Sequence, residues 1–84
     1  MKYKISKHCL RQIKLRGISE EEVKNVLNNP DFIQKQDDEI IVYQSLNKDK
    51  MFLYRVFINT SQIPNLVVTA YKTSKIRKYY ENKI

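Results

Sequence analysis

One histidine and one arginine are the residues of this sequence best suited to chemistry on a phosphate. His8 is the only histidine and the only side chain whose unperturbed pKa lies near neutrality. Arg55 offers a permanently charged guanidinium that can hold a phosphate in a fixed geometry. Metal-independent RNA hydrolysis needs a base for the 2′-hydroxyl, an acid for the leaving 5′-oxygen and a cation for the charge on the phosphorane. His8 and Arg55 supply two of these functions.

Strand alternation predicts which side chains accompany Arg55. In the run 51–58 the even positions are apolar, so we expect them to face the helices and Arg55 to face the other way. The same counting turns one set of residues towards the helices: Phe52, Tyr54, Val56, Ile58, Leu66, Val68, Ala70, Ile40 and Val42. It turns the remaining positions outwards, namely Val67, Ser45, Tyr43, Thr69 and Tyr71. A surface that combines an arginine, tyrosines and a hydroxyl suits RNA, because aromatic rings stack on bases.

Each of these residues also has a purely structural interpretation. His8 fits a capping or hydrogen-bonding residue in the first turn of a helix, and the sheet surface fits ordinary amphipathic strands in which Tyr and Thr are good β-formers. Cys9 is expected in the core, because its side chain diverges by about 100° from that of His8 on a helix. Glu20, Glu21 and Glu22 are expected to complement a helix dipole rather than to act in catalysis.

Two helices are predicted at the start of the chain. Ser6 is an N-cap for a helix that runs through about Arg16 and ends at Gly17, the only glycine. Ser19 followed by Glu22 forms a capping box that opens a second helix, which stops before Pro30.

Strands are predicted for most of the rest. Residues 2–5 form a short edge strand, and a period of two predicts four longer strands at 31–36, 39–46, 51–58 and 65–72. Their short connections favour an antiparallel meander, and a short helix is predicted within 73–83. The expected fold is α+β, with a short N-terminal strand and a helical hairpin packed on a four-stranded antiparallel sheet and a short C-terminal helix, all in one domain over 1–84.

Composition limits the classes of function. The net charge is +7, with +6 in residues 1–18, −4 in 19–50 and +5 in 51–84. A fold that brings the two basic ends together would form a positive surface, which would attract phosphates or an acidic protein. With one cysteine and one histidine, we expect no internal disulfide and no metal site. A phosphate loop, a dinucleotide fingerprint or a nucleophile elbow cannot be built with one glycine, and no cofactor is expected. No apolar run long enough for a membrane span or an export signal occurs, which predicts a cytoplasmic protein without a membrane partner.

Nearly the whole chain resembles a small bacterial domain family of unknown function. The resemblance rests on the opening SKHC, the corner RGISEEEV and the ending VVTAYKTSKI. That family is similar to RelE/ParE-like toxins and, more distantly, to colicin D-type ribonucleases, in which a helical hairpin covers a four-stranded antiparallel sheet.

The resemblance implies roles for individual residues. His8 becomes the candidate acid or base, Arg55 the phosphate-binding cation, and Tyr71 a third catalytic residue on the last strand. The expected substrate-binding residues are Arg11, Gln12, Arg16, Tyr43, Thr69, Thr73 and Lys75. One position departs from the family, which commonly has an arginine four residues after the histidine; Gln12 stands there and cannot neutralise a phosphate.

Three functions follow as hypotheses. The first is a toxin of a toxin–antitoxin system that cleaves RNA without a metal and is silenced by an antitoxin protein, and it predicts that His8 lies near Arg55. The second is a non-catalytic module of the same fold that binds nucleic acid or protein. The third is a ParE-like inhibitor of a protein target.

Overall fold

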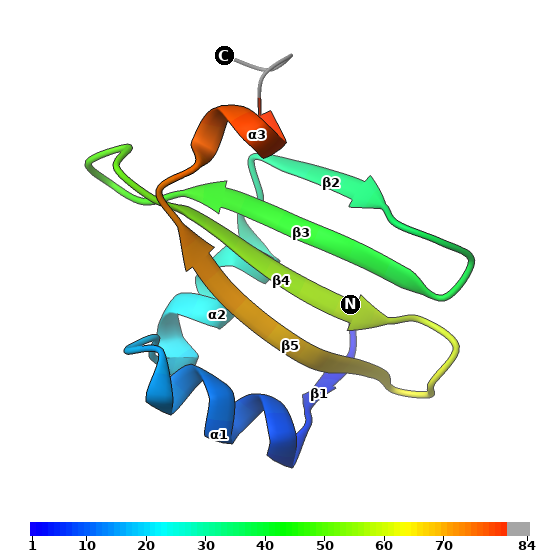
Figure 1. Ribbon diagram of the computed structural model, residues 1–84. Helices are drawn as coiled ribbons and strands as arrows, with labels where there is room; N and C mark the ends of the chain where they lie inside the picture. Colours follow the sequence, from blue (N-terminus) through cyan, green and yellow to red (C-terminus); the bar gives the residue numbers. More distant parts are fainter. Residues whose placement is uncertain (81–84) are drawn as a thin grey trace.

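The computed structural model describes residues 1–80 of the chain, which form five strands and three helices (Figure 1). In chain order the elements are β1 (Tyr3–Ile5), α1 (Lys7–Leu15), α2 (Glu20–Asn28), β2 (Phe32–Lys35), β3 (Ile40–Leu46), β4 (Leu53–Asn59), β5 (Asn65–Thr73) and α3 (Ile76–Tyr80). The α+β class and the order of elements are as predicted. The part of the predicted C-terminal helix beyond Tyr80 lies outside the described residues.

The sheet has five strands and is mixed, so the expectation of a four-stranded antiparallel sheet was wrong. Its order is β1-β5-β4-β3-β2. Strands β2 to β5 form the predicted antiparallel meander, while β1 joins the outer edge of β5 in parallel, with Tyr3 opposite Asn65 and Ile5 opposite Val67. Two intervening helices and three strands separate β1 from its partner in the chain. This pairing therefore depends on the tertiary fold. The sequence of residues 2–5 alone does not show which strand they join.

Both N-terminal helices begin and end where the sequence predicts. The side chain of Ser6 accepts a hydrogen bond from the Cys9 amide at 3.0 Å, and Gly17 follows α1 with a φ of +69°, a left-handed conformation that favours glycine. At the start of α2 the Ser19 and Glu22 side chains accept from each other's backbone amides at 3.0 and 2.9 Å. The capping box is confirmed.

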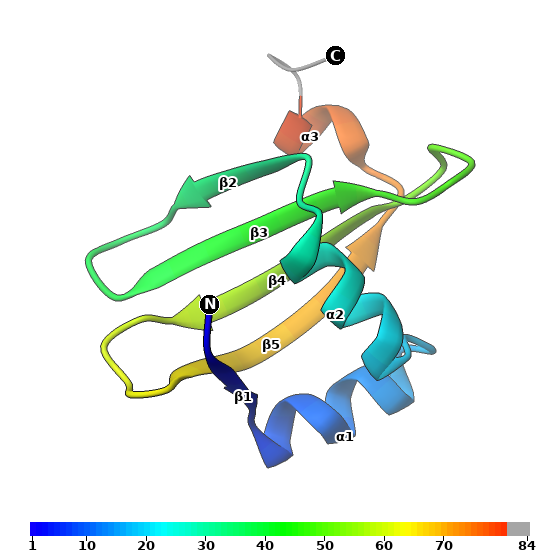
Figure 2. The same cartoon turned by 180° about the vertical axis from the view of Figure 1, so that it is seen from behind.

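The core lies between the helical pair and one face of the sheet (Figure 2). The helices α1 and α2 contribute the buried side chains of Cys9, Ile13, Val23, Val26 and Leu27. These pack against buried residues of β4 and β5, namely Val56, Ile58, Val67 and Ala70. Cys9 is fully buried, as expected of a core residue. Burial raises the pKa of its thiol, and the charge of Arg16 acts in the opposite direction.

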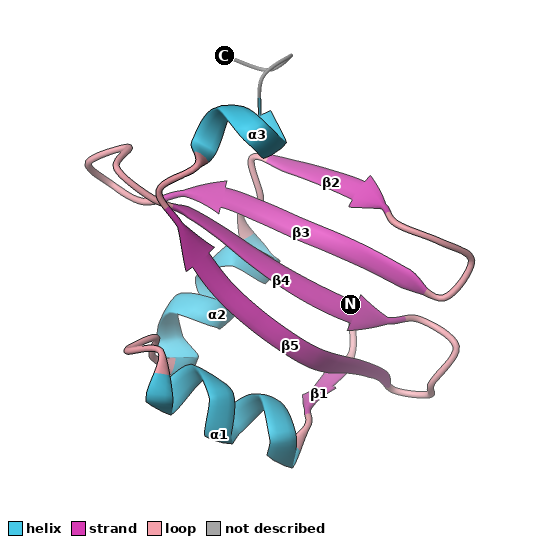
Figure 3. Ribbon diagram, in the orientation of Figure 1, coloured by secondary structure: helices cyan, strands magenta, loops and turns pink. Residues whose placement is uncertain are grey.

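The short helix α3 packs at one end of the sheet, away from α1 and α2 (Figures 1 and 3). Tyr80 is buried with its ring edge-on to Phe32, 4.6 Å between ring centroids. Phe32 pairs with Gln44, and Gln44 pairs with Arg55. The sheet face that carries these residues, opposite α1 and α2, is called here the open face.

The predicted side-chain orientations were wrong in two strands, β3 and β5, because register and not local pattern determines them. A β-bulge between Phe57 and Ile58 leaves Val68 without a partner, so Val67 enters the core instead of facing outwards. Tyr43 pairs with Val56 and packs against the helical core, so the assignment of strand β3 was reversed. The predicted orientation of Tyr54, Val56 and Ile58 towards the helices is confirmed.

Candidate functional site

Arg55 is buried at the centre of the open face. Only 8% of the residue is exposed. Its Nε donates to Gln44 Oε1 at 2.9 Å and its Nη1 donates to the Tyr71 hydroxyl at 2.5 Å. The two partners come from the neighbouring strands, in register on either side of Arg55. The predicted placement of Arg55 beside Tyr71 is therefore what the structure has.

Aromatic rings enclose the guanidinium. Its central carbon lies 3.9 Å from the ring centroid of Tyr79, 5.2 Å from that of Phe57 and 5.7 Å from that of Tyr71. These distances are typical of cation–π contacts. Gln44, Arg55, Phe57, Tyr71 and Tyr79 are called here the Arg55 cluster.

No acidic side chain within residues 1–80 forms an ion pair with Arg55, because the single ion pair of that part of the chain joins Lys35 to Asp38. Amide, hydroxyl and aromatic groups surround the charge instead. A cation held in this way keeps its positive potential available to an anion, because no carboxylate in that region neutralises it.

The two tyrosines of the cluster have pKa values displaced in opposite directions. Burial raises the pKa of Tyr71, and hydrogen bonding to Tyr79 adds to this effect, while the charge of Arg55 opposes it. Hydrogen bonding to Tyr71 lowers the pKa of Tyr79, and the nearby Lys78 and Arg55 act in the same direction. Paired groups whose environments separate their pKa values are suited to act as acid and base. The Tyr79 hydroxyl therefore loses its proton more readily than the Tyr71 hydroxyl, which keeps its own.

His8 is not part of this cluster. It is exposed in the first turn of α1, and α1 packs on the face opposite Arg55, through Cys9 and Ile13. The expectation that His8 lies near Arg55 was therefore wrong, because the parity of β4 directs Arg55 away from the helices. Arg11 is likewise exposed on α1.

Three of the predicted binding residues join α1 to the edge of β5. The Thr69 hydroxyl donates to Gln12 Oε1, and Arg16 Nη1 donates to the Ala70 carbonyl at 2.9 Å and approaches Thr69 Oγ1 at 3.3 Å. Strand β1 pairs with residues 65–67 only, so Ala70 lies beyond it on the outer edge of β5. Gln12 and Arg16 thus satisfy this edge from α1. Thr69 pairs with Phe57 and lies on the same side of β5 as Tyr71, as predicted, but its hydroxyl is bound to Gln12.

The remaining predicted residues lie apart from one another. Tyr43 packs on the helix side, with its hydroxyl 3.8 Å from Met1 Sδ. Thr73 ends β5, and its Oγ1 accepts from the Lys75 amide at 3.1 Å. Lys75 is exposed just before α3.

Sequence reasoning missed Gln44, Phe57 and Tyr79. Gln44 carried a usable signal, since a polar residue within an otherwise apolar strand needs a polar partner across the sheet. Tyr79 lies in α3, within the range 73–83 for which the sequence predicts only a short helix. Its contact with Arg55 depends on where α3 folds back, which periodicity does not specify.

The open face therefore defines a class: a small basic α+β domain with a buried arginine and two paired tyrosines opposite its helices. The chain belongs to the family described as Domain of unknown function (DUF4258), whose sequence profile matches residues 5–72. That range includes Arg55 and Tyr71 and ends before α3. No curated protein and no solved structure matches the chain.

Two further properties describe residues 1–80. No helix in this range has the length and apolar character needed to span a membrane. No group of three histidine, cysteine or acidic side chains in the same range is placed to hold a metal ion.

Proposed function

We propose that this protein binds RNA on its open face and cleaves it as a metal-independent endoribonuclease, in the manner of the RelE/ParE-like toxins that its sequence resembles. The observation that carries the proposal is the Arg55 cluster, in which one cation adjoins two phenols with oppositely displaced pKa values. The net charge of +7 favours a polyanionic substrate.

The proposed reaction is an internal transfer at phosphorus. Tyr79 acts as the base after its hydroxyl has lost a proton to solvent: its oxygen removes the proton of a 2′-hydroxyl, and the 2′-oxygen forms a bond to the adjacent phosphorus. The bond from phosphorus to the 5′-oxygen breaks, and Tyr71 donates its proton to that oxygen. The products are a 2′,3′-cyclic phosphate and a 5′-hydroxyl end. Arg55 stabilises the additional negative charge of the phosphorane and holds Tyr71 in position.

A second candidate is a module that binds RNA or protein without cleaving it. The burial of Arg55 favours this alternative, because two of its N–H groups already donate to Gln44 and Tyr71. The exposed position of His8 on the other side of the sheet also favours it.

The test is cleavage of RNA by the purified protein in the presence of a chelator. The variants are Tyr79→Phe, Tyr71→Phe and the matched control Tyr43→Phe, whose hydroxyl lies on the helix side. We expect Tyr79→Phe and Tyr71→Phe to reduce the rate by about 10²–10⁴-fold, typical of a lost acid or base, and Tyr43→Phe to be unchanged. The new ends should carry a cyclic phosphate and a 5′-hydroxyl.

Intact RNA with folded wild-type protein would refute the ribonuclease proposal and favour the binding module. Expression in bacteria tests the toxin role separately. Wild-type protein should arrest growth, and Tyr79→Phe at equal abundance should not. Growth arrest that persists in this variant would point instead to a protein target.

A further inference from the structure

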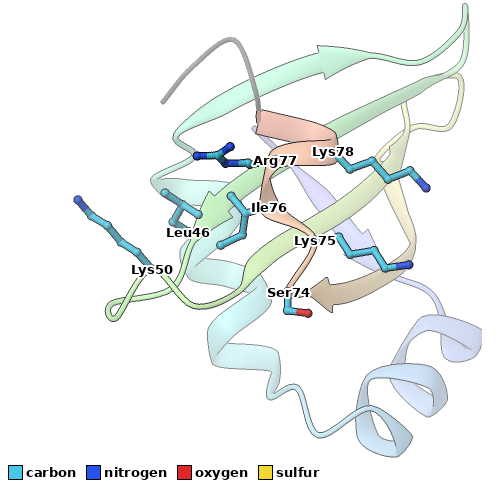
Figure 4. Close-up of a pocket in the computed structure, with 7 residues that line it drawn as sticks. All are labelled: Leu46, Lys50, Ser74, Lys75, Ile76, Arg77 and Lys78. Atoms are coloured by element: carbon cyan, nitrogen blue, oxygen red, sulfur yellow. The ribbon is translucent and has the colours of Figure 1, made fainter.

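A second basic site lies at the end of the sheet beside α3 (Figure 4). It is an open pocket of about 570 Å³, formed by the end of β3, the β3–β4 turn and the segment that leads into α3. The lining residues are Leu46, Lys50, Ser74, Lys75, Ile76, Arg77 and Lys78. Four of the seven carry a positive charge, and none is acidic.

The pocket combines these charges with an apolar floor. In Figure 4 the side chains of Leu46 and Ile76 lie next to each other, with Lys75 and Lys78 extending to one side and Lys50 and Arg77 to the other. This pairing of apolar surface with cations matches the two parts of a nucleotide. A base can rest on the apolar floor while its phosphates contact the charged ends.

Lys78 connects this pocket to the Arg55 cluster. Its Nζ lies 5.3 Å from the ring centroid of Tyr79, the same ring that Arg55 contacts at 3.9 Å. Lys78 therefore belongs to the lining of the pocket and to the surroundings of Tyr79, so the two sites are adjacent.

The backbone at Lys50 adds an independent observation. Lys50 has a φ of +56°, a left-handed conformation in which glycine is favoured over every other residue. Asn47 fixes the turn, because its Oδ1 accepts from the amides of Met51 and Phe52 at 2.8 and 2.9 Å. Lys50 therefore holds a backbone conformation that favours glycine, and its side chain lines the pocket.

We propose that this pocket is a subsite for single-stranded RNA, which holds a nucleotide next to the one at the Arg55 cluster. The proposal rests on the proposed RNA binding but not on cleavage. Charge complementarity and adjacency to the cluster select a nucleic acid over an uncharged peptide. The pocket contributes affinity, and the cluster contributes chemistry.

Binding is measured with a short fluorescent 2′-O-methyl oligonucleotide, which lacks the nucleophile and cannot be cleaved. The pocket variant is Lys50→Gln with Arg77→Gln, and the control is Lys14→Gln with Lys24→Gln, which removes the same charge from α1 and α2. Each phosphate contact contributes about 0.7 to the slope of log affinity against log salt for a single strand. The pocket variant should therefore lower the slope by about 1.4, and between about 50 and 200 mM salt wild type should lose about sevenfold more affinity than the variant.

Equal losses in the pocket and control variants would overturn the proposal, because binding would then depend on net charge alone. Equal competition by polyglutamate of similar length would also overturn it and indicate an acidic protein as the partner. Normal binding of the oligonucleotide without cleavage of RNA would refute the proposed ribonuclease and leave the subsite standing. Folding of each variant is checked by circular dichroism.

Discussion

Replacing Tyr71 with phenylalanine removes one hydroxyl from the Arg55 cluster and leaves the aromatic ring in place. The hydroxyl accepts from Arg55 Nη1 at 2.5 Å, and Arg55 is only 8% exposed. Water therefore has little access to replace the lost partner, and a buried donor on a charged group is left unpaired. This differs from the loss of a hydroxyl at the surface.

A hydrogen bond to a charged group contributes about 1.5–3 kcal/mol to stability. Tyr71 is half-buried, so we expect a value near the lower limit, about 1.5 kcal/mol. A domain of this size loses about 4–8 °C in melting temperature per kcal/mol, which predicts a decrease of roughly 6–12 °C.

The assay is urea and thermal unfolding followed by circular dichroism, with Tyr79→Phe as the matched control. Phenylalanine at position 79 retains the ring contact with Arg55 and loses only the neutral hydrogen bond to Tyr71, so this variant should lose about 0.5 kcal/mol, less than Tyr71→Phe. A double-mutant cycle with Arg55→Met should assign most of the Tyr71→Phe effect to the pair. If both tyrosine variants are equally stable, the hydrogen bond between Arg55 and the Tyr71 hydroxyl does not stabilise the protein. The inference that Arg55 holds Tyr71 in position would then be refuted.

Three further predictions concern the framework around the site, each measured by urea unfolding. The hydrogen bond from Tyr54 lowers the pKa of Glu22 below its ordinary value of 4.5, so Glu22 takes up a proton at a higher pH in the unfolded chain than in the folded protein. The free energy of unfolding should therefore decrease as the pH falls below about 4.5. In Glu22→Gln this decrease should be smaller. Lys50→Gly should raise stability by up to about 1 kcal/mol, because glycine accepts a positive φ without strain, and a loss would contradict the strain argument. Ser19→Ala should cost about 1 kcal/mol by breaking the capping box, whereas Ser19→Gly should cost only a few tenths; an unchanged Ser19→Ala would show that α2 does not need its cap.

The sequence was a good guide wherever a short segment determines the structure by itself. The caps at Ser6 and Ser19 and the left-handed Gly17 are local features, and each occurs as predicted. Alternation along β4 was also reliable, because the pairing of Arg55 with Tyr71 needs only the parity of two adjacent strands.

Prediction failed where distant segments decide the outcome. The bulge opposite Phe57 shifts β5 by one residue, which reverses the orientation of Val67, and the partner of β1 is set by a strand far along the chain. The placement of His8 near Arg55 required both to share one side of the sheet. That assumption came from the groups that a ribonuclease needs and not from any spacing in the chain.

The parallel pairing of β1 with β5 has a consequence for synthesis of the protein. Residues 3–5 leave the ribosome well before their partners at 65–67 and before the core residues Val67 and Ala70. The apolar side of helices α1 and α2 therefore stays exposed until β4 and β5, which cover it, have been made. Such non-local contacts slow folding. The Arg55 cluster needs Tyr71 and Tyr79, so it forms only after α3 has been made, and a shorter nascent chain carries no complete site.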